Sequence, residues 1–468
     1  MIASNLVKGQ RVSSQVKRKL AELGTPIVEN QGKAALKKAA KSLDNLVLSS
    51  PTLRNQVTLH VSADEAHKAL MDSIKNAKKS FHIETFIWHN DEAGNDIARR
   101  LGAKVRLARM KGEEFDAKVL IDGLGLRNGT GGAGDAKLMD KMRKYGVDVR
   151  EFNRHKVSLD PVGIPITHRK LYIADNDSFI TGGRNIGDEY LKPTFKNGDK
   201  VETSWHDLLY TVKGEETDRI HREFFENWER AGGKAPSDLP KPAPVSGEAK
   251  IQSFVTDPHA GTKSLQEAHF KAIRGAQKEI MAIYPYFSDD GLINELISAK
   301  RANTAKRAEL LGAAQNKYDR MAIDQAVPEL QVKVLLPGHR EAGGEGAVYT
   351  LLNQENARQM LQEGIDVRYF YGGKIDGKEV ERFSHFKGMM IDGELLSVGS
   401  ANGDARTYAS NHELVTMISD PKTLKAFQEK VAIPDWESAR PASLEALDAA
   451  PLTTKLKRKV LEALDFLL

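Results

Sequence analysis

The sequence contains one chemically distinctive motif twice. Both copies read H-x-K-x4-D-x6-G-[GS]-x-N, the first beginning at His168 and the second at His385. The offset is the same at both ends, since 385 − 168 and 402 − 185 both give 217 residues. One match could arise by chance, whereas two copies in register indicate a shared task. The residues concerned are His168, Lys170, Asp175 and Asn185 in the first copy, and His385, Lys387, Asp392 and Asn402 in the second.

The spacing gathers these side chains around one point. A His and a Lys two residues apart on a strand point to the same face of the sheet. The strands that follow, residues 178–181 and 394–398, are expected to return antiparallel, because turn-forming Asp, Asn and Gly residues precede them. They bring the small residues Gly183 and Ser400 beside the His, where a ligand can approach the backbone. Each half therefore offers an imidazole, an ammonium group and an amide to a ligand.

Two such sets suit a phosphodiester. Lys and Asn side chains can hold the non-bridging oxygens and stabilise charge that develops in the transition state. One His can attack phosphorus while the other donates a proton to the leaving alkoxide, then removes a proton from water or an acceptor alcohol. A His pKa near neutrality makes both roles feasible in one site. Because the ammonium groups supply positive charge and no carboxylate cluster has metal-ligand spacing, we expect neither a metal nor another cofactor.

These residues strongly resemble the phospholipase D superfamily, whose signature is a double H-x-K-x4-D motif. The resemblance covers roughly residues 55–430. It implies an α/β fold of two similar lobes, each a mixed β-sheet flanked by helices, that form a pseudo-dimer with one active site at the interface. It also implies a covalent phosphohistidine intermediate. In that family the Asp of the motif is usually structural, which gives Asp175 and Asp392 that role here.

The same resemblance assigns roles to the reacting groups. The first-motif His is more often the nucleophile, so His168 would attack phosphorus and His385 would act as acid and base; the residues themselves do not distinguish the two. A carboxylate further along the chain normally orients each His. The matching positions in this sequence are Asp207 and Glu413.

Within the superfamily the sequence is most similar to the cardiolipin synthase branch. This likeness is carried by SFHIETFIW (80–88), GGRNIGDEY (182–190), the WHD segment (205–207) and GSANGDARTYASNHE (399–413). Glu84 matches a Glu that recurs in the branch, and we expect it to bind substrate, although a buried ion pair is an equally good interpretation. Three features depart from the branch: no N-terminal membrane helix is visible, Thr167 replaces the usual Asn before the first His, and residues 300–328 form a charged helical insertion.

Alternating strands and helices in each half must position the motifs. The predicted strand, strand, helix and strand of the first half are residues 79–88, 117–125, 136–146 and 147–152. The same order recurs in the second half at residues 278–287, 330–338, 355–364 and 365–370. This pattern predicts two α/β lobes that are copies of one domain. Tyr286, within the first of the later strands, is expected to line a lipid channel.

Changes in composition divide the chain. Residues 234–250 contain four prolines, which lack backbone donors and prevent regular structure, so this segment is expected to be a linker. A second break begins at Ile433 and is followed by residues with helical apolar spacing. The expected division is a helical N-terminal extension (1–54), a first lobe (55–233), the Pro-rich linker (234–250), a second lobe (251–432), and a C-terminal linker with an amphipathic helix (433–468).

Composition limits the classes of function. The chain has 468 residues, a net charge of +5 and no Cys, which excludes disulfides, zinc-thiolate sites and a Cys nucleophile. No apolar stretch is long enough to span a bilayer, and no secretory signal is visible. We therefore expect a cytoplasmic or peripheral membrane location, with signal-free export left open. The basic C-terminal helix would lie either on an anionic membrane or against its own lobe.

The leading interpretation is a metal-independent phospholipase D or phosphatidyltransferase of the cardiolipin synthase type, with a phospholipid as substrate. One alternative is a nuclease that applies the same chemistry to DNA or RNA, for which the modest charge is a weak argument against. Another is a catalytically inert membrane-binding scaffold, which the two complete motifs disfavour. No obligate protein partner is inferred.

Overall fold

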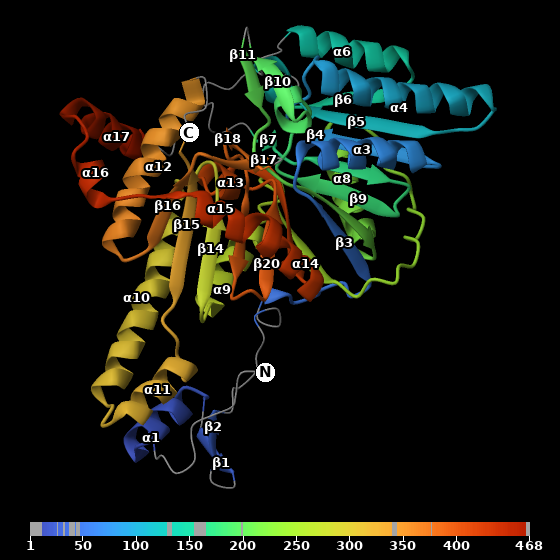
Figure 1. Cartoon of the computed structure of the whole chain (residues 1–468). Helices are drawn as coiled ribbons and strands as arrows, with labels where there is room; N and C mark the ends of the chain where they lie inside the picture. Colours follow the sequence, from blue (N-terminus) through green and yellow to red (C-terminus); the bar gives the residue numbers. More distant parts are fainter. Residues whose placement is uncertain are drawn as a thin grey trace.

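The computed structural model contains two large β-sheets, each flanked by helices (Figure 1). It describes residues 12–464 except residues 26, 31–32, 37–42, 44–46, 129–132, 154–164, 198–199, 339–343 and 376. The first sheet has seven strands, and the second has nine. This architecture confirms the predicted α/β class with two similar lobes.

The first sheet consists of strands that precede the Pro-rich segment. In spatial order they are β3 (Asn55–His60), β12 (Leu209–Gly214), β9 (Ser178–Gly182), β8 (Leu171–Ala174), β4 (Ser80–Thr85), β5 (Asp116–Asp122) and β6 (Asp148–Phe152). Strands β4, β5 and β6 run parallel, and the strands from β8 to β3 continue the sheet antiparallel. The helices of this lobe are α3 (Ala63–Asn76), α4 (Glu92–Met110), α5 (Gly123–Asn128), α6 (Ala133–Lys144), α7 (Asp188–Leu191) and α8 (Glu216–Arg230).

The second sheet repeats this order with later strands. They are β13 (Lys250–Thr256), β21 (Asn411–Ser419), β20 (Leu395–Gly399), β19 (Gly388–Ile391), β14 (Glu279–Ile283), β15 (Gln331–Pro337), β16 (Asp366–Phe370) and the short β22 (Arg440–Pro441). The ninth strand, β7 (Ile166–Thr167), comes from the first lobe and pairs with β21. Here β14, β15 and β16 form the parallel part. Its helices include α9 (Ser264–Gly275), α10 (Asp290–Gly312), α11 (Lys317–Ala326), α12 (Gly344–Gln362) and α13 (Ala405–Ala409). Equivalent Asp residues, Asp91 and Asp289, cap α4 and α10.

A hydrophobic core joins the two lobes. Tyr210 and Phe224 of the first lobe belong to the same buried cluster as Phe370 and Leu396 of the second. The Tyr210 hydroxyl also donates a hydrogen bond to the Val398 carbonyl over 2.9 Å. Each lobe has a further core of its own on the opposite face of its sheet. The motif strands β8 and β19 therefore lie in sheets whose inner faces pack against each other.

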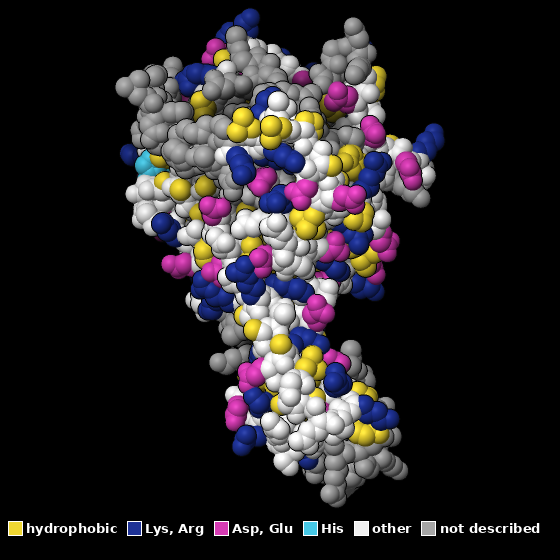
Figure 2. Space-filling model, turned by 90° about the vertical axis from the view of Figure 1, so that its left-hand side faces the viewer, with side chains coloured by type: hydrophobic (Ala, Val, Ile, Leu, Met, Phe, Trp, Pro, Cys, Tyr) yellow, Lys and Arg dark blue, Asp and Glu magenta, His cyan; other side chains and the backbone are white. Residues whose placement is uncertain are grey.

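A helical projection extends from the second lobe, at the bottom of Figures 1 and 2. It consists of the far ends of α10 and α11 together with α1 (Ser14–Glu22) from the N-terminal region. Their contact is apolar, with Val16 and Leu20 packed in one cluster with Leu310 and Ile323. The charged insertion is thus helical, and α1 covers its apolar side.

Part of the N-terminal region differs from the expected helices. Two short strands, β1 (Ile27–Asn30) and β2 (Lys33–Leu36), form an antiparallel pair. The β-branched Ile27 and Val28 favour an extended backbone, and pairing between the two strands outweighs the helix propensity of the alanines in β2.

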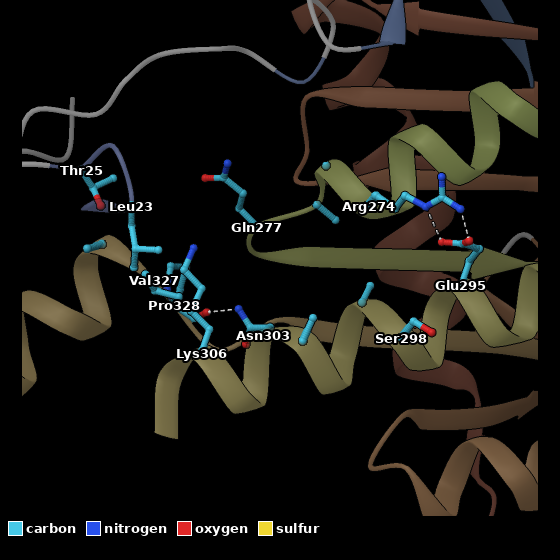
Figure 3. Close-up of a pocket in the computed structure, with 15 residues that line it drawn as sticks. Leu23, Thr25, Arg274, Gln277, Glu295, Ser298, Asn303, Lys306, Val327 and Pro328 are labelled. Atoms are coloured by element: carbon cyan, nitrogen blue, oxygen red, sulfur yellow. Dashed lines mark hydrogen bonds and ion pairs between the residues drawn. The ribbon is translucent and has the colours of Figure 1, made fainter. Parts of the chain in front are cut away.

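A pocket of about 630 Å³ lies where the N-terminal region meets the second lobe (Figure 3). Leu23 and Thr25 line one side, Asn303 and Val327 line another, and the ion-paired Arg274 lies at the lobe end. No residue of the repeated motif lines this pocket. The motif residues therefore lie in another part of the fold.

The C-terminal region packs on the second lobe. The break expected at Ile433 is instead the helix α15 (Ile433–Ser438), which contains Pro434 and continues without interruption from a π-helical turn (Gln428–Ala432). The elements around it are α14 (Pro421–Phe427), α16 (Leu444–Asp448) and α17 (Leu452–Leu464). Helix α17 lies against α12, and the buried Arg458 donates to the Leu447 carbonyl. The Pro-rich residues 234–249 form no helix or strand.

Candidate active site

The Asp of each motif lies in the tight turn after the motif strand. Asp175 and Asp392 both adopt a left-handed backbone conformation with φ of 55°. The Asp175 carboxylate accepts hydrogen bonds from the backbone N–H groups of residues 78–80, and Asp392 accepts from those of residues 277–279. Each carboxylate thereby fastens the motif turn to the start of β4 or β14. Both residues thus serve the fold at the end of the motif strand.

Each motif His is oriented by a carboxylate from the opposite lobe. His168 Nδ1 lies 2.9 Å from Glu413 Oε1, and His385 Nδ1 lies 2.7 Å from Asp207 Oδ2. Glu413 is on β21 of the second lobe, whereas Asp207 directly precedes β12 of the first. The two imidazoles are 8% and 5% exposed, so each keeps a small edge open. This exchange joins the two lobes into one site.

Backbone hydrogen bonds between the lobes add to these two His–carboxylate contacts. Strand β7 (Ile166–Thr167) of the first lobe pairs in parallel with the start of β21. The His168 N–H then donates to the His412 carbonyl over 3.0 Å. In the equivalent arrangement the His385 N–H donates to the His206 carbonyl over 2.8 Å. Both motif His residues are therefore held across the interface by backbone as well as by side chain.

The small residues of the motif lie behind the orienting carboxylates. A Cβ added to Gly183 would lie 2.3 Å from an Asp207 carboxylate oxygen, so only glycine leaves room for that side chain. The Ser400 hydroxyl donates to Glu413 and is fully buried. We expected Gly183 and Ser400 to contact a ligand directly. The structure brings both of them against the groups that orient the imidazoles.

The motif lysines lie beside the motif His residues. Lys170 Nζ donates to the His168 carbonyl over 2.7 Å, and Lys387 Nζ donates to the His385 carbonyl over 2.6 Å. Lys387 Nζ also lies 3.0 Å from His385 Nε2. Burial lowers the pKa of Lys170 well below its ordinary value, although Glu413 opposes this shift. An anion bound between the two ammonium groups would relieve their mutual repulsion and stabilise their charged forms.

Both motif imidazoles are neutral at neutral pH. Burial lowers the pKa of His168 to about 4 and that of His385 to about 3. The charges of the motif lysines contribute to these shifts, whereas the orienting carboxylates oppose them. A neutral imidazole has the lone pair that attack on phosphorus requires. The other imidazole can act as an acid once a negatively charged ligand raises its pKa.

The motif amides are buried beside this centre. Asn185 is 2% exposed, and its amide nitrogen donates to the Tyr190 hydroxyl over 3.0 Å. Asn402 is 5% exposed. Within the described part of the chain, the Oδ1 atoms of both amides lack a hydrogen-bond partner. Each can accept a hydrogen bond from a hydroxyl group of a ligand.

Aromatic rings surround the two imidazoles. The ring centroids lie 5.3 to 6.5 Å from those of His168 or His385, and the residues are Phe86, Tyr190, Trp205, Tyr286 and Phe383. Tyr286 was expected near the site from sequence. The others were not, although Phe86, Tyr190 and Trp205 lie inside segments that resemble the family, and Phe383 lies two residues before His385. Their position in the sequence, near the motifs, could have suggested a place in the site. Strand register alone does not reveal whether an aromatic side chain faces the motif His residues.

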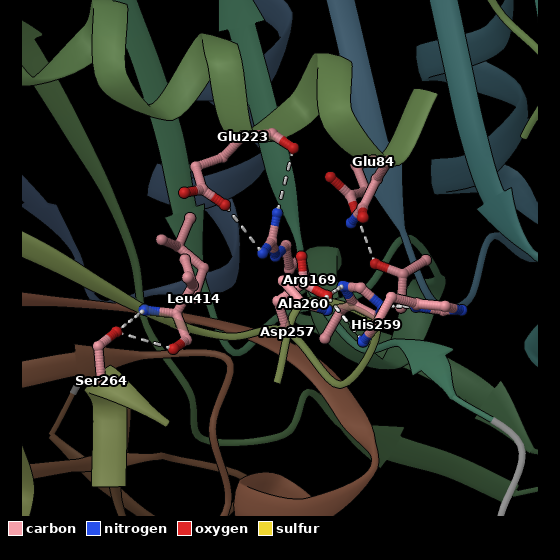
Figure 4. Close-up of polar contacts among 12 residues, drawn as sticks. Glu84, Arg169, Glu223, Asp257, His259, Ala260, Ser264 and Leu414 are labelled. Atoms are coloured by element: carbon pink, nitrogen blue, oxygen red, sulfur yellow. Dashed lines mark hydrogen bonds and ion pairs between the residues drawn. The ribbon is translucent and has the colours of Figure 1, made fainter. Parts of the chain in front are cut away.

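A buried polar layer supports the first motif (Figure 4). Glu84 is fully buried and accepts hydrogen bonds from the Thr167 hydroxyl and, over 2.7 Å, from the Asn227 amide. Burial raises the pKa of Glu84, although hydrogen bonds and Arg169 oppose the shift. Arg169, between the motif His and Lys, pairs with Glu223 over 3.2 Å. Thr167, which departs from the family pattern, thus has a partner in Glu84 on β4, the strand that pairs with the motif strand β8.

In the described part of the chain, one group of side chains has metal-ligand chemistry: Asp257, His259 and His412. Asp257 already accepts the backbone N–H groups of His259 and Ala260 over 2.9 and 3.0 Å, and it pairs with Arg230 over 2.9 Å. His259 Nδ1 lies 2.8 Å from His412 Nε2. Because these atoms have protein partners and a guanidinium lies beside the carboxylate, the group fits a hydrogen-bond network better than a cation site.

Comparisons with known proteins identify the family of this chain. The sequence profile of the family described as "Cardiolipin synthase, PLD-like domain" matches residues 70–228 and 270–433. A protein named cardiolipin synthase from Listeria welshimeri serovar 6b is 27% identical over 383 residues, which cover 81% of this chain and 68% of the relative. A cardiolipin synthase from Clostridium perfringens (strain 13 / Type A) is 24% identical over 426 residues, covering 88% and 77%.

A solved structure shares the fold. The crystal structure of phosphatidylserine synthase from Haemophilus influenzae Rd KW20 matches with a TM-score of 0.63 at 15% sequence identity, covering 92% of this chain and 100% of that one. Each of the two segments matched by the family profile thus contains one copy of the motif and strands of one sheet. The chain belongs to the PLD-like domain family of cardiolipin synthase, and it is an enzyme of the phospholipase D superfamily.

Proposed function

We propose that the protein is a phosphatidyltransferase or phospholipase D that acts on phospholipid phosphodiesters through a phosphohistidine and requires no metal. The observation that carries this proposal is the exchange of His–carboxylate pairs between the lobes. It occupies Nδ1 of each motif His, so Nε2 is the nitrogen that reacts, and in His385 this atom lies beside Lys387 Nζ. The charge of Lys387 also acts on the pKa of His168, and that of Lys170 acts on the pKa of His385, which supports one shared centre.

In the first step, His168 Nε2 attacks phosphorus and the bond to the leaving alkoxide breaks. His385 donates a proton to the alkoxide oxygen, having gained that proton when the anionic phosphate raised its pKa. Glu413 stabilises the positive charge that His168 acquires. Lys170 and Lys387 hold the non-bridging oxygens of phosphorus.

In the second step, the phosphoenzyme transfers its phosphatidyl group. His385 removes a proton from water or from an alcohol, the oxygen of that molecule bonds to phosphorus, and the bond between phosphorus and His168 breaks. The unpartnered Oδ1 atoms of Asn185 and Asn402 can accept hydrogen bonds from hydroxyl groups of either reactant. Water gives hydrolysis, and an alcohol gives transfer.

Two observations favour a phospholipid over a nucleic acid. The relatives are named for cardiolipin synthesis, and aromatic rings line the reacting imidazoles.

Contact with the membrane surface would follow from such a substrate. Among the described helices, none combines the length and apolar character needed to cross a bilayer. Leu452 and Leu456 on α17 are 82% and 63% exposed, and the neighbouring Lys457 and Lys459 are exposed as well. We infer a peripheral contact of this helix with an anionic bilayer. Leu456→Ser should reduce sedimentation with phosphatidylglycerol vesicles.

The direct test uses phosphatidylglycerol vesicles with and without added glycerol, in EDTA, with products identified by mass spectrometry. Cardiolipin indicates transfer, and phosphatidic acid alone indicates hydrolysis. His168→Ala should abolish both products, whereas His67→Gln, which alters a His outside the site, should not. Loss of turnover in EDTA would contradict the metal-free mechanism. Cleavage of DNA or RNA by a protein inert on lipids would favour a nuclease.

A further inference from the structure

A second His accompanies each orienting carboxylate. His206 directly precedes Asp207, and His412 directly precedes Glu413. Both of these imidazoles are buried, being 1% and 0% exposed. Their carbonyl oxygens accept the backbone N–H groups of His385 and His168. Each of these His–acid pairs therefore holds the opposite lobe's motif His twice, by a carbonyl and by a carboxylate.

Aromatic rings from equivalent strands pack on both of these imidazoles. His206 stacks on Phe370 at the end of β16, with ring centroids 5.0 Å apart and planes inclined by 26°. His412 meets Phe152, at the end of β6, edge to face at 5.1 Å and 78°. In each case the aromatic ring and the imidazole come from different lobes. The repeat thus includes this contact although neither His belongs to the repeated motif.

His206 has a carboxylate partner of its own. Its Nε2 lies 2.6 Å from Asp435 Oδ2, and Asp435 is 4% exposed on α15. Burial lowers the pKa of His206 although Asp435 opposes the shift, so the ring is neutral and donates its Nε2–H. On the other side, His412 has His259 at 2.8 Å, and its Nδ1 lies 3.8 Å from Asp257.

We propose that His206, fixed by Asp435, is a positioning residue for His385, and that His412 has the equivalent role for His168. The proposal rests on the proposed function, in which both motif His residues react. The His206 carbonyl and the Asp207 carboxylate belong to consecutive residues and bind the same imidazole-bearing residue. Rotation of the His206 backbone would therefore shift both contacts to His385 together. Asp435 and Phe370 prevent that rotation by holding the His206 ring.

The kinetic test compares Asp435→Asn and His206→Phe with the wild-type chain on phosphatidylglycerol vesicles and on bis(p-nitrophenyl) phosphate. Asp435→Asn removes the charge while keeping the shape, and His206→Phe keeps the stacking while removing the hydrogen bond. Each should lower kcat roughly 10- to 100-fold, the range found for groups that orient a reacting side chain, with KM changed less than about threefold. Asp435→Ala should lower kcat further than Asp435→Asn.

The matched control is Asp116→Asn. Asp116 also lies beside a buried imidazole, His82, at 3.1 Å, but at the opposite end of its strand from the motif His residues. Because Asp116 is half-exposed, this variant should lose no more thermal stability than Asp435→Asn, and it should retain wild-type kcat. An equal loss of kcat in Asp116→Asn and Asp435→Asn would assign the effect to general destabilisation and would overturn the proposal.

A readout without substrate separates this proposal from the proposed function. In ¹⁵N-His-labelled protein, His385 should be the neutral tautomer with its proton on Nδ1, where Asp207 accepts it. Asp435→Asn and His206→Phe should mix the two tautomers of His385 and leave that of His269 unchanged. If the wild type acts on neither substrate but the tautomers mix as described, the proposed function fails and the positioning role stands. A folded variant with unchanged kcat and an unchanged His385 tautomer overturns the positioning role.

Discussion

A histidine that attacks phosphorus must present one nitrogen and keep its orientation fixed by the other. In this protein the fixing group always comes from the opposite lobe, and the reacting rings are neutral because they are buried. The same burial destabilises the protonated imidazoles until an anion binds beside them. In the proposed mechanism substrate binding and acid formation are coupled, because one phosphate both occupies the site and raises the pKa of the imidazole that must donate a proton.

Blocking the second step should trap the covalent intermediate. In His385→Asn, a phosphodiester with a p-nitrophenolate leaving group needs no proton from the enzyme, so His168 should still attack it. The deprotonation of water then lacks a base, and one equivalent of p-nitrophenol should appear in a rapid burst followed by turnover at least about 100-fold slower than wild type. Stopped-flow absorbance measures the burst, and mass spectrometry locates the phosphoryl adduct.

His168→Asn is the matched variant for that experiment. It removes the nucleophile and should give neither a burst nor an adduct. A burst in His168→Asn together with none in His385→Asn would reverse the roles assigned to the two histidines.

At the scale of single elements, the motif turns are held by one carboxylate each. Asp392 accepts three backbone N–H groups at the start of β14, and Asp392→Ala leaves them without that acceptor. We expect the free energy of unfolding to fall by about 2–4 kcal/mol, measured by urea denaturation. Asp392→Asn, which keeps one acceptor oxygen and tolerates the left-handed backbone, should lose about half as much. The control is Asp366→Ala, which removes a half-exposed carboxylate from β16 and should lower the free energy of unfolding by less than about 1 kcal/mol.

A buried His on α9 should make folding stability depend on pH. Burial lowers the pKa of His269 to about 4, and its ring nitrogens contact the Tyr408 and Ser397 hydroxyls. Below the ordinary His pKa of about 6.5, the unfolded chain binds a proton that the folded chain excludes, so stability falls as pH drops. For this one group the loss is roughly 2 kcal/mol between pH 7 and pH 5.

Comparing wild type with His269→Gln isolates this effect, because the carboxylates with their own pKa shifts are present in both proteins. Urea denaturation at pH 7 and pH 5 should show that the variant loses less stability than the wild type on acidification. Equal losses in the two proteins would contradict the linkage to His269.

Sequence reasoning predicted the elements better than their contacts. The motif spacing places His168 and Lys170 on one face of a strand, because strand periodicity is a local property. The resemblance supplied Asp207 and Glu413, and the structure adds which His each one orients. That pairing depends on the exchange of segments between lobes, which no local pattern encodes. Asp435 was missed for the same reason, since it reaches His206 from a segment whose Pro and polar residues resembled a linker.

At the scale of the whole molecule, the interface between the lobes contains both their shared hydrophobic core and the candidate site. The cluster that contains Tyr210, Phe370 and Leu396 spans both sheets, and both His–carboxylate pairs cross the same boundary. A lobe that moved away from its partner would expose this core and would separate each imidazole from its carboxylate. Folding of the interface and assembly of the site are therefore one event.

The two lobes should consequently unfold in a single transition. Trp88, Trp205 and Trp228 lie in the first lobe and Trp436 in the second, so emission from Trp436→Phe follows the first lobe, and emission from a variant with Trp88, Trp205 and Trp228 all changed to Phe follows the second. Both signals and the loss of activity should share one midpoint in urea. Leu396→Ala, which removes buried volume from the shared core, should lower the free energy of unfolding by about 2–5 kcal/mol and shift all three midpoints together. Separate midpoints for the two Trp signals would mean that the lobes are stable apart, and the interface would then be a contact between independent domains.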